Sequence, residues 1–356
     1  MQLFISLSVM IVLAAAETSL WNYTLPSTAE LNGWVAGNSA FVALSSSESL
    51  TVLSAETGDV LWTNTAKYSP PAFTPRNDII VAATIQSMNA FDAKSGTRMW
   101  SKNMVLPRTD IAPVITADGT VIVYFTNSGY GCGMNITDGR PLWINPSLLC
   151  KSTLARITAA PSGDTVFVSC VDNGFFAVAG RTGNILWNAT SFVAVYHSVV
   201  VDRKVLVLSS TSSSPPLNCN LAALDVDTGS SLWVSYLDHH SWTSPAQGLK
   251  GQVFAVTSYE IASFNTSSLL AVRIKDGFVV SQNAIPLSSN AIVAYDGITV
   301  LGSNGTVAAY QGGDCIWSMS TPTQGMVSQQ PIVLNTQRTR VLWADTYGSL
   351  GVIQLP

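Results

Sequence analysis

One short unit recurs along this chain of 356 residues and restricts the folds that it can adopt. Its clearest copy is LAALDVDTGSSLWVSY, from Leu221 to Tyr236. Alternating residues lead to a Thr-Gly pair, and the hydrophobic run that follows carries a tryptophan four residues after the glycine. Alternation is typical of strands, whose successive side chains face opposite sides, and Thr-Gly is typical of a tight turn. The unit therefore predicts two antiparallel strands joined by a turn.

Seven copies of the unit can be aligned on the glycine of the turn. These glycines are Gly58, Gly96, Gly139, Gly183, Gly229, Gly277 and Gly313. Successive glycines are 38, 43, 44, 46, 48 and 36 residues apart. This spacing is typical of a β-propeller, in which each four-stranded blade occupies a repeat of this length.

A tryptophan stands at the same place in six of the seven copies, and the other copy has Ser281 there. The tryptophans are Trp62, Trp100, Trp143, Trp187, Trp233 and Trp317, and Trp21 matches them in the N-terminal segment. A large aromatic side chain at a fixed position of each outer strand can bury much of its surface against the next blade. We therefore interpret these residues as structural. A sugar or cofactor platform is disfavoured, because equivalent positions belong to different blades.

Upstream of each unit lies a second block that supplies the two inner strands of a blade. Its clearest copy, PVITADGTVIVY from Pro113 to Tyr124, has an Asp-Gly turn between two β-branched runs. The other copies span residues 33–44, 71–82, 159–169, 199–208, 245–256, 291–301 and 331–344. Block and unit together predict a four-stranded antiparallel blade.

The two ends of the chain are predicted to share one blade. Three strands follow Pro331, and no tryptophan strand comes after them. The segment Ser19 to Thr24, SLWNYT, matches ILWNAT from Ile185 to Thr190 and can supply the missing outer strand. This pairing would close the ring and leave no sheet edge open. The predicted fold is all-β, a single domain over residues 17–356 that forms a closed eight-bladed propeller.

Residues 1–16, MQLFISLSVMIVLAAA, are predicted to be a signal peptide that is cleaved before Glu17. The apolar run is short for a membrane span, although an uncleaved anchor is the alternative. The expected location is outside the cell or in the lumen of the secretory or endolysosomal pathway. Only 11% of the residues are charged, the net charge is −4 and no polybasic run is present, which argues against a nucleic-acid partner.

The chain has five cysteines, an odd number, so an oxidising compartment would leave at least one thiol free or paired with another chain. They are Cys132, Cys150, Cys170, Cys219 and Cys315. Cys150 and Cys170 are predicted to form a disulfide, because one follows an outer strand and the other lies in the next blade. No Cys-x-x-Cys motif is present, which makes a zinc site improbable. Cys315 is predicted to be a small core residue of an outer strand.

Five asparagines stand in Asn-x-Ser/Thr sequons, the acceptor motif for N-glycans. Asn22 and Asn188 each directly follow an outer-strand tryptophan, where the side chain should face outward, and are the best candidates. Asn265 and Asn304 are further candidates. Asn135 occupies the position of Asp92 and Asp225 in other copies, so its amide is expected to serve the turn.

The pattern A-x-D-x-x-T-G-x-x-L-W, over residues 20–356, resembles the tryptophan-docking repeat of the pyrroloquinoline-quinone-like (PQQ-like) β-propeller superfamily. That superfamily includes quinoprotein alcohol dehydrogenases, the bacterial outer-membrane assembly lipoprotein BamB and luminal stress-sensor domains of kinases. The resemblance implies the fold and says little about activity. For an enzyme it would imply adjacent cysteines on the quinone, an acidic calcium ligand and a catalytic aspartate. No two cysteines are adjacent here, and no acidic residue matches those positions, so no catalytic residue is assigned.

Two connections are predicted contact loops. The first, Tyr236 to Ser244, contains Asp238, His239, His240 and Trp242. Adjacent histidines on an extended segment point in opposite directions, which disfavours joint coordination of one metal ion. The second, Ser209 to Asn220, is a low-complexity insertion that can equally be a flexible surface excursion.

The sequence favours a non-catalytic scaffold that binds a protein partner and works as a monomeric ring without a cofactor. Partners would dock on the blade-edge loops by surface complementarity or by adding a strand. The alternative is an oxidoreductase that binds PQQ with calcium and acts on alcohols or sugars. A luminal sensor of unfolded chains is a third possibility.

Overall fold

The computed structural model describes residues 19–354 except 26–30, 38–39, 105–106, 151–155, 171–173, 193, 211–218, 238–245, 248–250, 262–263, 286–290, 296–297, 304–305, 312–313, 321–331, 334–339 and 345–348. These described residues form strands joined by turns and loops, without helices. None of them belongs to a helix long and apolar enough to cross a membrane.

The strands of the described residues form eight sheets of four antiparallel strands each, numbered here in chain order. The first sheet has β2 (Leu31–Gly37), β3 (Phe41–Ser46), β4 (Ser49–Ser54) and β5 (Val60–Thr65), and the second has β6 (Ala72–Phe73), β7 (Ile79–Ala83), β8 (Ser87–Asp92) and β9 (Arg98–Asn103). The third has β10 (Val114–Ile115), β11 (Val121–Phe125), β12 (Tyr130–Asn135) and β13 (Pro141–Leu149), and the fourth has β14 (Arg156–Ala159), β15 (Thr165–Cys170), β16 (Gly174–Ala179) and β17 (Ile185–Ala189).

The remaining sheets continue the order along the chain. The fifth has β18 (Ala194–Val201), β19 (Lys204–Ser210), β20 (Cys219–Asp225) and β21 (Ser231–Leu237), and the sixth has β22 (Ala246–Gln247), β23 (Gln252–Ile261), β24 (Phe264–Arg273) and β25 (Val279–Ile285). The seventh has β26 (Ala291–Tyr295), β27 (Ile298–Ser303), β28 (Thr306–Gln311) and β29 (Asp314–Ser320). The eighth joins β30 (Ile332–Val333), β31 (Arg340–Ala344) and β32 (Ser349–Gln354) to the N-terminal β1 (Ser19–Thr24).

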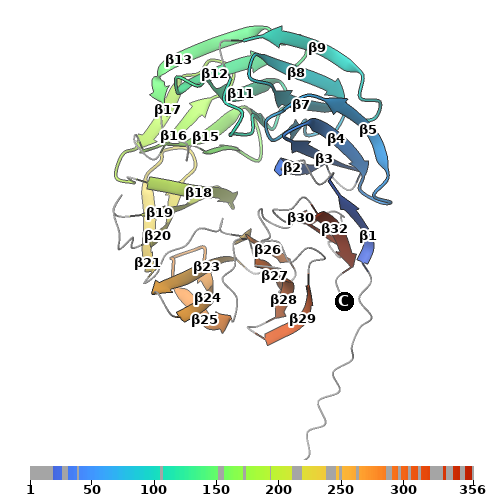
Figure 1. Ribbon diagram of the computed structural model, residues 1–356. Coiled ribbons are helices and arrows are strands. Elements are labelled where there is room, and N and C mark those ends of the chain that lie inside the picture. Colours follow the sequence, from blue (N-terminus) through green and yellow to red (C-terminus); the bar gives the residue numbers. More distant parts are fainter. Residues whose placement is uncertain are drawn as a thin grey trace, which may run out of the picture.

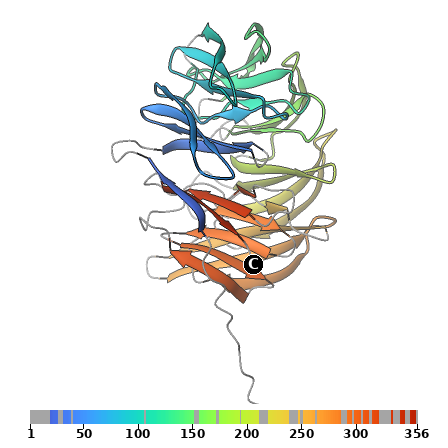
Figure 2. The same cartoon turned by 90° about the vertical axis from the view of Figure 1, so that its right-hand side faces the viewer.

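The sheets are arranged in chain order around a common centre, with outer strands such as β9 and β13 at the periphery (Figure 1). Seen from the side, neighbouring sheets stack face to face (Figure 2). This arrangement is a β-propeller. The N-terminal segment that the sequence assigns to the last sheet does pair there, because β1 runs antiparallel to β32 with Tyr23 opposite Leu350.

The hydrophobic core is divided among the seams between sheets. Phe91 and Ile80 of the second sheet pack with Val52 and Leu50 of the first, and similar clusters follow around the molecule. One of these clusters joins the eighth sheet to the first, since Trp21 and Val352 pack against Val42 and Leu44. Sheets with such a cluster on each side are therefore buried on both faces, which explains why their inner strands lack the strict alternation of polar and apolar residues.

Candidate functional site

The tryptophans of six outer strands make the same contact with the following sheet. The indole Nε1 of Trp62 donates a hydrogen bond to the carbonyl oxygen of Ala93 at 2.9 Å, and that of Trp233 donates to Ile274 at 2.8 Å. The same bond joins Trp21 to Ala55, Trp100 to Ile136, Trp143 to Gly180 and Trp187 to Val226. The acceptor always lies three residues before the turn glycine. These indoles therefore each link one sheet to the next and have a structural role.

The turn glycines that follow these acceptors lie directly under the indoles. Gly183 has φ of +73°, and a Cβ atom placed there would lie 2.4 Å from Cδ2 of Trp143. Glycine alone suits this position, because it tolerates positive φ and leaves room for the ring. Gly58, Gly96, Gly139, Gly229 and Gly277 repeat this geometry, whereas Gly313 lies outside the described residues.

The seam between the sixth and seventh sheets is built differently. Ser281 is exposed where the other outer strands carry a buried or half-buried tryptophan, and the facing strand has Tyr310, only 3% exposed. Strand register gives Tyr310 the place of Phe91, whose ring packs against Trp62 with centroids 5.8 Å apart. This seam therefore has an aromatic side chain on the facing strand but none at position 281. At the next seam Trp317 packs against the cluster of Val341 and Trp343.

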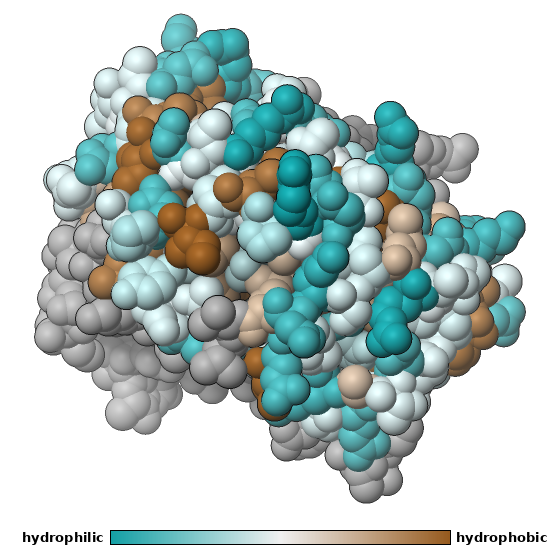
Figure 3. Space-filling model, turned by 90° about the horizontal axis from the view of Figure 1, so that it is seen from above, coloured by the Kyte–Doolittle hydropathy of each residue, from teal (hydrophilic) through white to brown (hydrophobic). Residues whose placement is uncertain are grey.

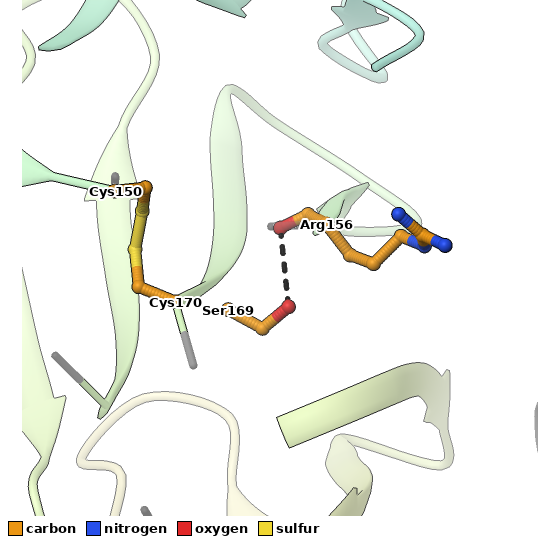
Figure 4. Close-up of a disulfide and its surroundings, with 4 residues drawn as sticks. All are labelled: Cys150, Arg156, Ser169 and Cys170. Atoms are coloured by element: carbon orange, nitrogen blue, oxygen red, sulfur yellow. Dashed lines mark hydrogen bonds between the residues drawn. A yellow bond between two sulfur atoms is a disulfide. The ribbon is translucent and has the colours of Figure 1, made fainter. Parts of the chain in front are cut away.

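A disulfide joins Cys150, just after β13, to Cys170 at the end of β15, so it links the third sheet to the fourth (Figure 4). Both cysteines are buried with Ile111 and Phe125. Figure 4 also shows Ser169 donating to the backbone oxygen of Arg156, at 3.4 Å. The structure therefore contains the cysteine pair that the sequence suggests.

The other cysteines differ in their surroundings. Cys132 and Cys219 are buried, and burial raises the pKa of the Cys132 thiol to about 11. Cys315 is exposed, so its interpretation as a core residue is wrong. The register of β29 shifts between Cys315 and Trp317, and this bulge breaks the alternation that would have turned both side chains inward.

Charged residues are distributed unevenly between the two ends of the strands. We call one end the turn face, formed by the connections between first and second and between third and fourth strands of each sheet. The other end, the loop face, carries the remaining connections. Among the described connections, the turn face holds Glu56, Asp59, Arg76, Asp78, Lys94, Asp118, Asp138, Arg140, Asp164, Arg181, Asp202, Arg203, Asp227, Lys275 and Asp276, against Glu48, Lys67, Arg108 and Asp110 on the loop face. Low charge is typical of the core of a protein interface.

The turn face is a network of polar contacts. Arg181 of the fourth sheet bonds Asp118 of the third at 2.8 Å, and Arg273 bonds Asp276 at 2.7 Å. Burial raises the pKa of Asp118, but hydrogen bonds from Thr116 and Arg181 outweigh it and lower that pKa to about 2. Sequence reasoning missed the Arg181–Asp118 pair, because 63 residues separate the partners and no local pattern marks them.

One ion pair holds a described connection of the loop face. Arg108, 7% exposed, donates from Nε to Oδ1 of Asp110 at 2.9 Å, while its backbone N–H donates to Phe125. Burial raises the pKa of Asp110, but the hydrogen bond and charge of Arg108 outweigh it, so that pKa is below its ordinary value. The pair fixes this connection at the end of the third sheet. Its residues carried no recognisable signal in the sequence.

The outer strands expose apolar side chains at the rim of the molecule. Several of these side chains directly precede a seam tryptophan: Leu20, Leu61, Met99, Leu186, Leu232 and Ile316. Figure 3 shows the molecule of Figure 1 from above, with separate hydrophobic patches among hydrophilic side chains. β21 is the most continuous case, because Leu232, Val234 and Tyr236 are all exposed on one face and Tyr236 is 76% exposed.

Most of both predicted contact loops falls outside the described residues. Residues 211–218 and 238–245 lie outside the described part of the chain, and the second range contains Asp238, His239, His240 and Trp242. Among the residues that the structure describes, no group of three His, Cys, Asp or Glu side chains is placed to hold a metal ion. The buried disulfide lies in the seam between the third and fourth sheets.

The geometry defines the molecule as a β-propeller of four-stranded sheets. The family model described as "Outer membrane protein assembly factor BamB" matches residues 8–235 and 149–351. The chain therefore belongs to this PQQ-like β-propeller family, which confirms the resemblance read from the repeats.

Solved structures show the same fold at low sequence identity. BamB from Moraxella catarrhalis is 18% identical, with a TM-score of 0.73 over 96% of this chain and 98% of that one. Sqt1 from Saccharomyces cerevisiae is 14% identical, with a TM-score of 0.73 over 96% and 99%. A quinohemoprotein alcohol dehydrogenase from Pseudomonas putida is 12% identical, with a TM-score of 0.65 over 94% and 75%. No curated protein matches the chain significantly. These likenesses concern the fold alone.

Proposed function

We propose that the chain is a secreted or luminal, non-catalytic scaffold that binds a protein partner. Its mature part, residues 17–356, would be a single eight-bladed ring closed by β1 and would act as a monomer. The assembly factor BamB and Sqt1 have similar propellers, which supports a role in protein interaction. The seams support a rigid platform, because each described indole bond ties one sheet to the next.

The exposed face of β21 is the observation that carries this proposal. Leu232, Val234 and Tyr236 form an uncharged apolar row on an outer strand. The strand ends where the connection 238–245 begins on the loop face, and its sheet also carries the connection 211–218. Exposed apolar side chains gathered in one place mark interaction sites in soluble proteins. The partner would therefore contact β21 and the adjacent loop face.

A crosslinking experiment with matched variants tests this site. Purified full-length protein would carry a photoreactive side chain beside Tyr236 or, as a control, beside Met99 on β9. Crosslinked proteins from the compartment in which the chain resides would then be identified by mass spectrometry. We expect one partner to be captured from β21 and lost in the Val234→Ser, Tyr236→Ser variant. Equal capture from both strands, or capture that survives the double substitution, would contradict the proposed site.

The alternative of a PQQ oxidoreductase is tested directly by titration with PQQ and calcium. A ligand that binds only the folded state raises the melting temperature. The scaffold proposal predicts no shift at high ligand excess. A stoichiometric complex with a raised melting temperature would replace it.

A further inference from the structure

We propose that Asn188 and Asn22 carry N-linked glycans and that Asn135 does not. The three asparagines stand in sequons of the same form, Asn-x-Thr. The repeat pattern already sets Asn135 apart from the other two, and their positions in the sheets give the physical reason. The inference rests on the proposed location, since the oligosaccharide is attached in the secretory pathway.

Asn188 lies on the outer strand β17 with its sequon ordered by strand alternation. Asn188 and Thr190 are exposed, whereas Ala189 between them is buried against the core of the fourth and fifth sheets. The acceptor amide and the hydroxyl of the sequon therefore share the solvent-facing side of the strand. A bulky polar group attached there would extend from an exposed side chain.

Asn22 repeats this arrangement on β1. Asn22 and Thr24 are exposed, while Tyr23 packs against the core between the eighth and first sheets. Asn22 follows Trp21 as Asn188 follows Trp187, and both indoles are held in their seams by hydrogen bonds. The seam tryptophan thus turns the next residue outward in both strands.

Asn135 lies in a different environment although its motif is the same. It ends the third strand of its sheet, is half-buried, and its Oδ1 accepts a hydrogen bond from the backbone N–H of Thr137 at 2.7 Å. Its backbone N–H and C=O also bond Arg140 and Gly139 within the turn. Ile136, which follows it, receives the indole bond of Trp100. A glycan would have to leave this tight turn beside a seam, so we expect the site to stay unmodified.

The covalent step is transfer from a lipid-linked oligosaccharide. Nδ2 of asparagine forms a bond to the anomeric carbon of the first sugar and loses one proton. The bond between that carbon and the pyrophosphate of the lipid breaks, and the lipid pyrophosphate leaves. No redox partner is involved.

The glycans would occupy a position that other outer strands use differently. The residue after the seam tryptophan is Ile144 in β13 and Val234 in β21, both exposed apolar side chains. A glycan at this position covers an edge strand and opposes pairing with another chain. The fourth and eighth sheets would then be shielded, whereas β21 would remain open to the partner.

The test uses the full chain expressed in cells whose secretory pathway attaches N-glycans. Secreted protein is digested, treated with peptide N-glycosidase in heavy-oxygen water, and scored for conversion of asparagine to aspartate. We expect conversion at Asn188 and Asn22 and none at Asn135. Asn188→Gln and Thr190→Ala should each remove the same glycan. Asn184→Gln, an exposed asparagine without a sequon, should change nothing.

A second expression with a foreign signal peptide separates the two proposals. An unmodified Asn188 in protein exported by the foreign signal would overturn the glycan proposal. Glycosylation with the foreign signal but no export with residues 1–16 would leave the acceptor sites standing and overturn the proposed location. Occupancy of Asn135 equal to that of Asn188 would refute the argument from strand position.

Discussion

Replacement of Gly183 by alanine tests the seam geometry most directly. A non-glycine residue at φ of +73° costs about 1 to 2 kcal/mol. The new Cβ would also lie 2.4 Å from Cδ2 and 2.5 Å from Cε3 of Trp143, closer than atoms can approach. The indole must then leave its seat and give up its hydrogen bond to Gly180, worth about 1 kcal/mol, together with part of its packing. We expect a total loss of about 3 to 5 kcal/mol.

Gly163→Ala is the matched control. Gly163 has φ of +72°, but a Cβ there would meet nothing within 4 Å. It should therefore lose only about 1 to 2 kcal/mol, the backbone part of the effect. Both variants are measured by denaturant unfolding followed by tryptophan fluorescence, with the slope checked for unchanged cooperativity. In a Trp143→Leu background, Gly183→Ala should cost no more than the control. Equal losses for the two glycine variants in the wild-type background would refute the reasoning.

Further predictions concern single polar groups. The pKa of Asp118 is about 2 when folded and about 3.9 in an unfolded chain, so its stabilisation is present above pH ~4 and is lost as pH falls toward 2. The free energy of unfolding should therefore depend less on pH between about 4 and 2 in Asp118→Asn than in the wild type. An equal pH dependence in the two proteins would contradict the ion pair. The Oγ of Ser209 is buried and has no hydrogen-bond partner among the described residues, so Ser209→Ala should leave the free energy of unfolding equal or raise it. Ser46→Ala, which removes an acceptor for the N–H of Ser49, should lower it by about 1 kcal/mol. At pH 8 a thiol reagent should label Cys315 in the folded protein and spare Cys132; labelling of both would show that the seam opens.

The repeat made most of the fold predictable. Turn glycine and tryptophan together predicted the third and fourth strands of six sheets, and Ser19 to Thr24 was predicted as a strand because it copies the strand that contains Trp187. Side-chain direction was predictable wherever a strand is regular. It failed at Cys315, because a bulge is invisible in a pattern based on alternation.

The candidate site was less predictable than the fold. The exposed row of Leu232, Val234 and Tyr236 follows from knowing which face of β21 is fixed by Trp233, and that fact requires the neighbouring sheet. The pair of Arg181 and Asp118 likewise depends on contact between sheets. Local patterns encode the strands, whereas the surface is set by how the sheets stack.

The seams also determine which surfaces remain for binding. In a strand such as β21, Trp233 is committed to the next sheet, so the opposite face carries Leu232, Val234 and Tyr236 to solvent. The same commitment in β17 presents Asn188 in place of an apolar residue. The seam tryptophan thus leaves the residue after it exposed on the outer strand. The identity of that residue decides whether the strand would carry a glycan or present an apolar surface to a partner. Under the proposed function, a chain of similar repeats would in this way direct its partner to one sector of its rim.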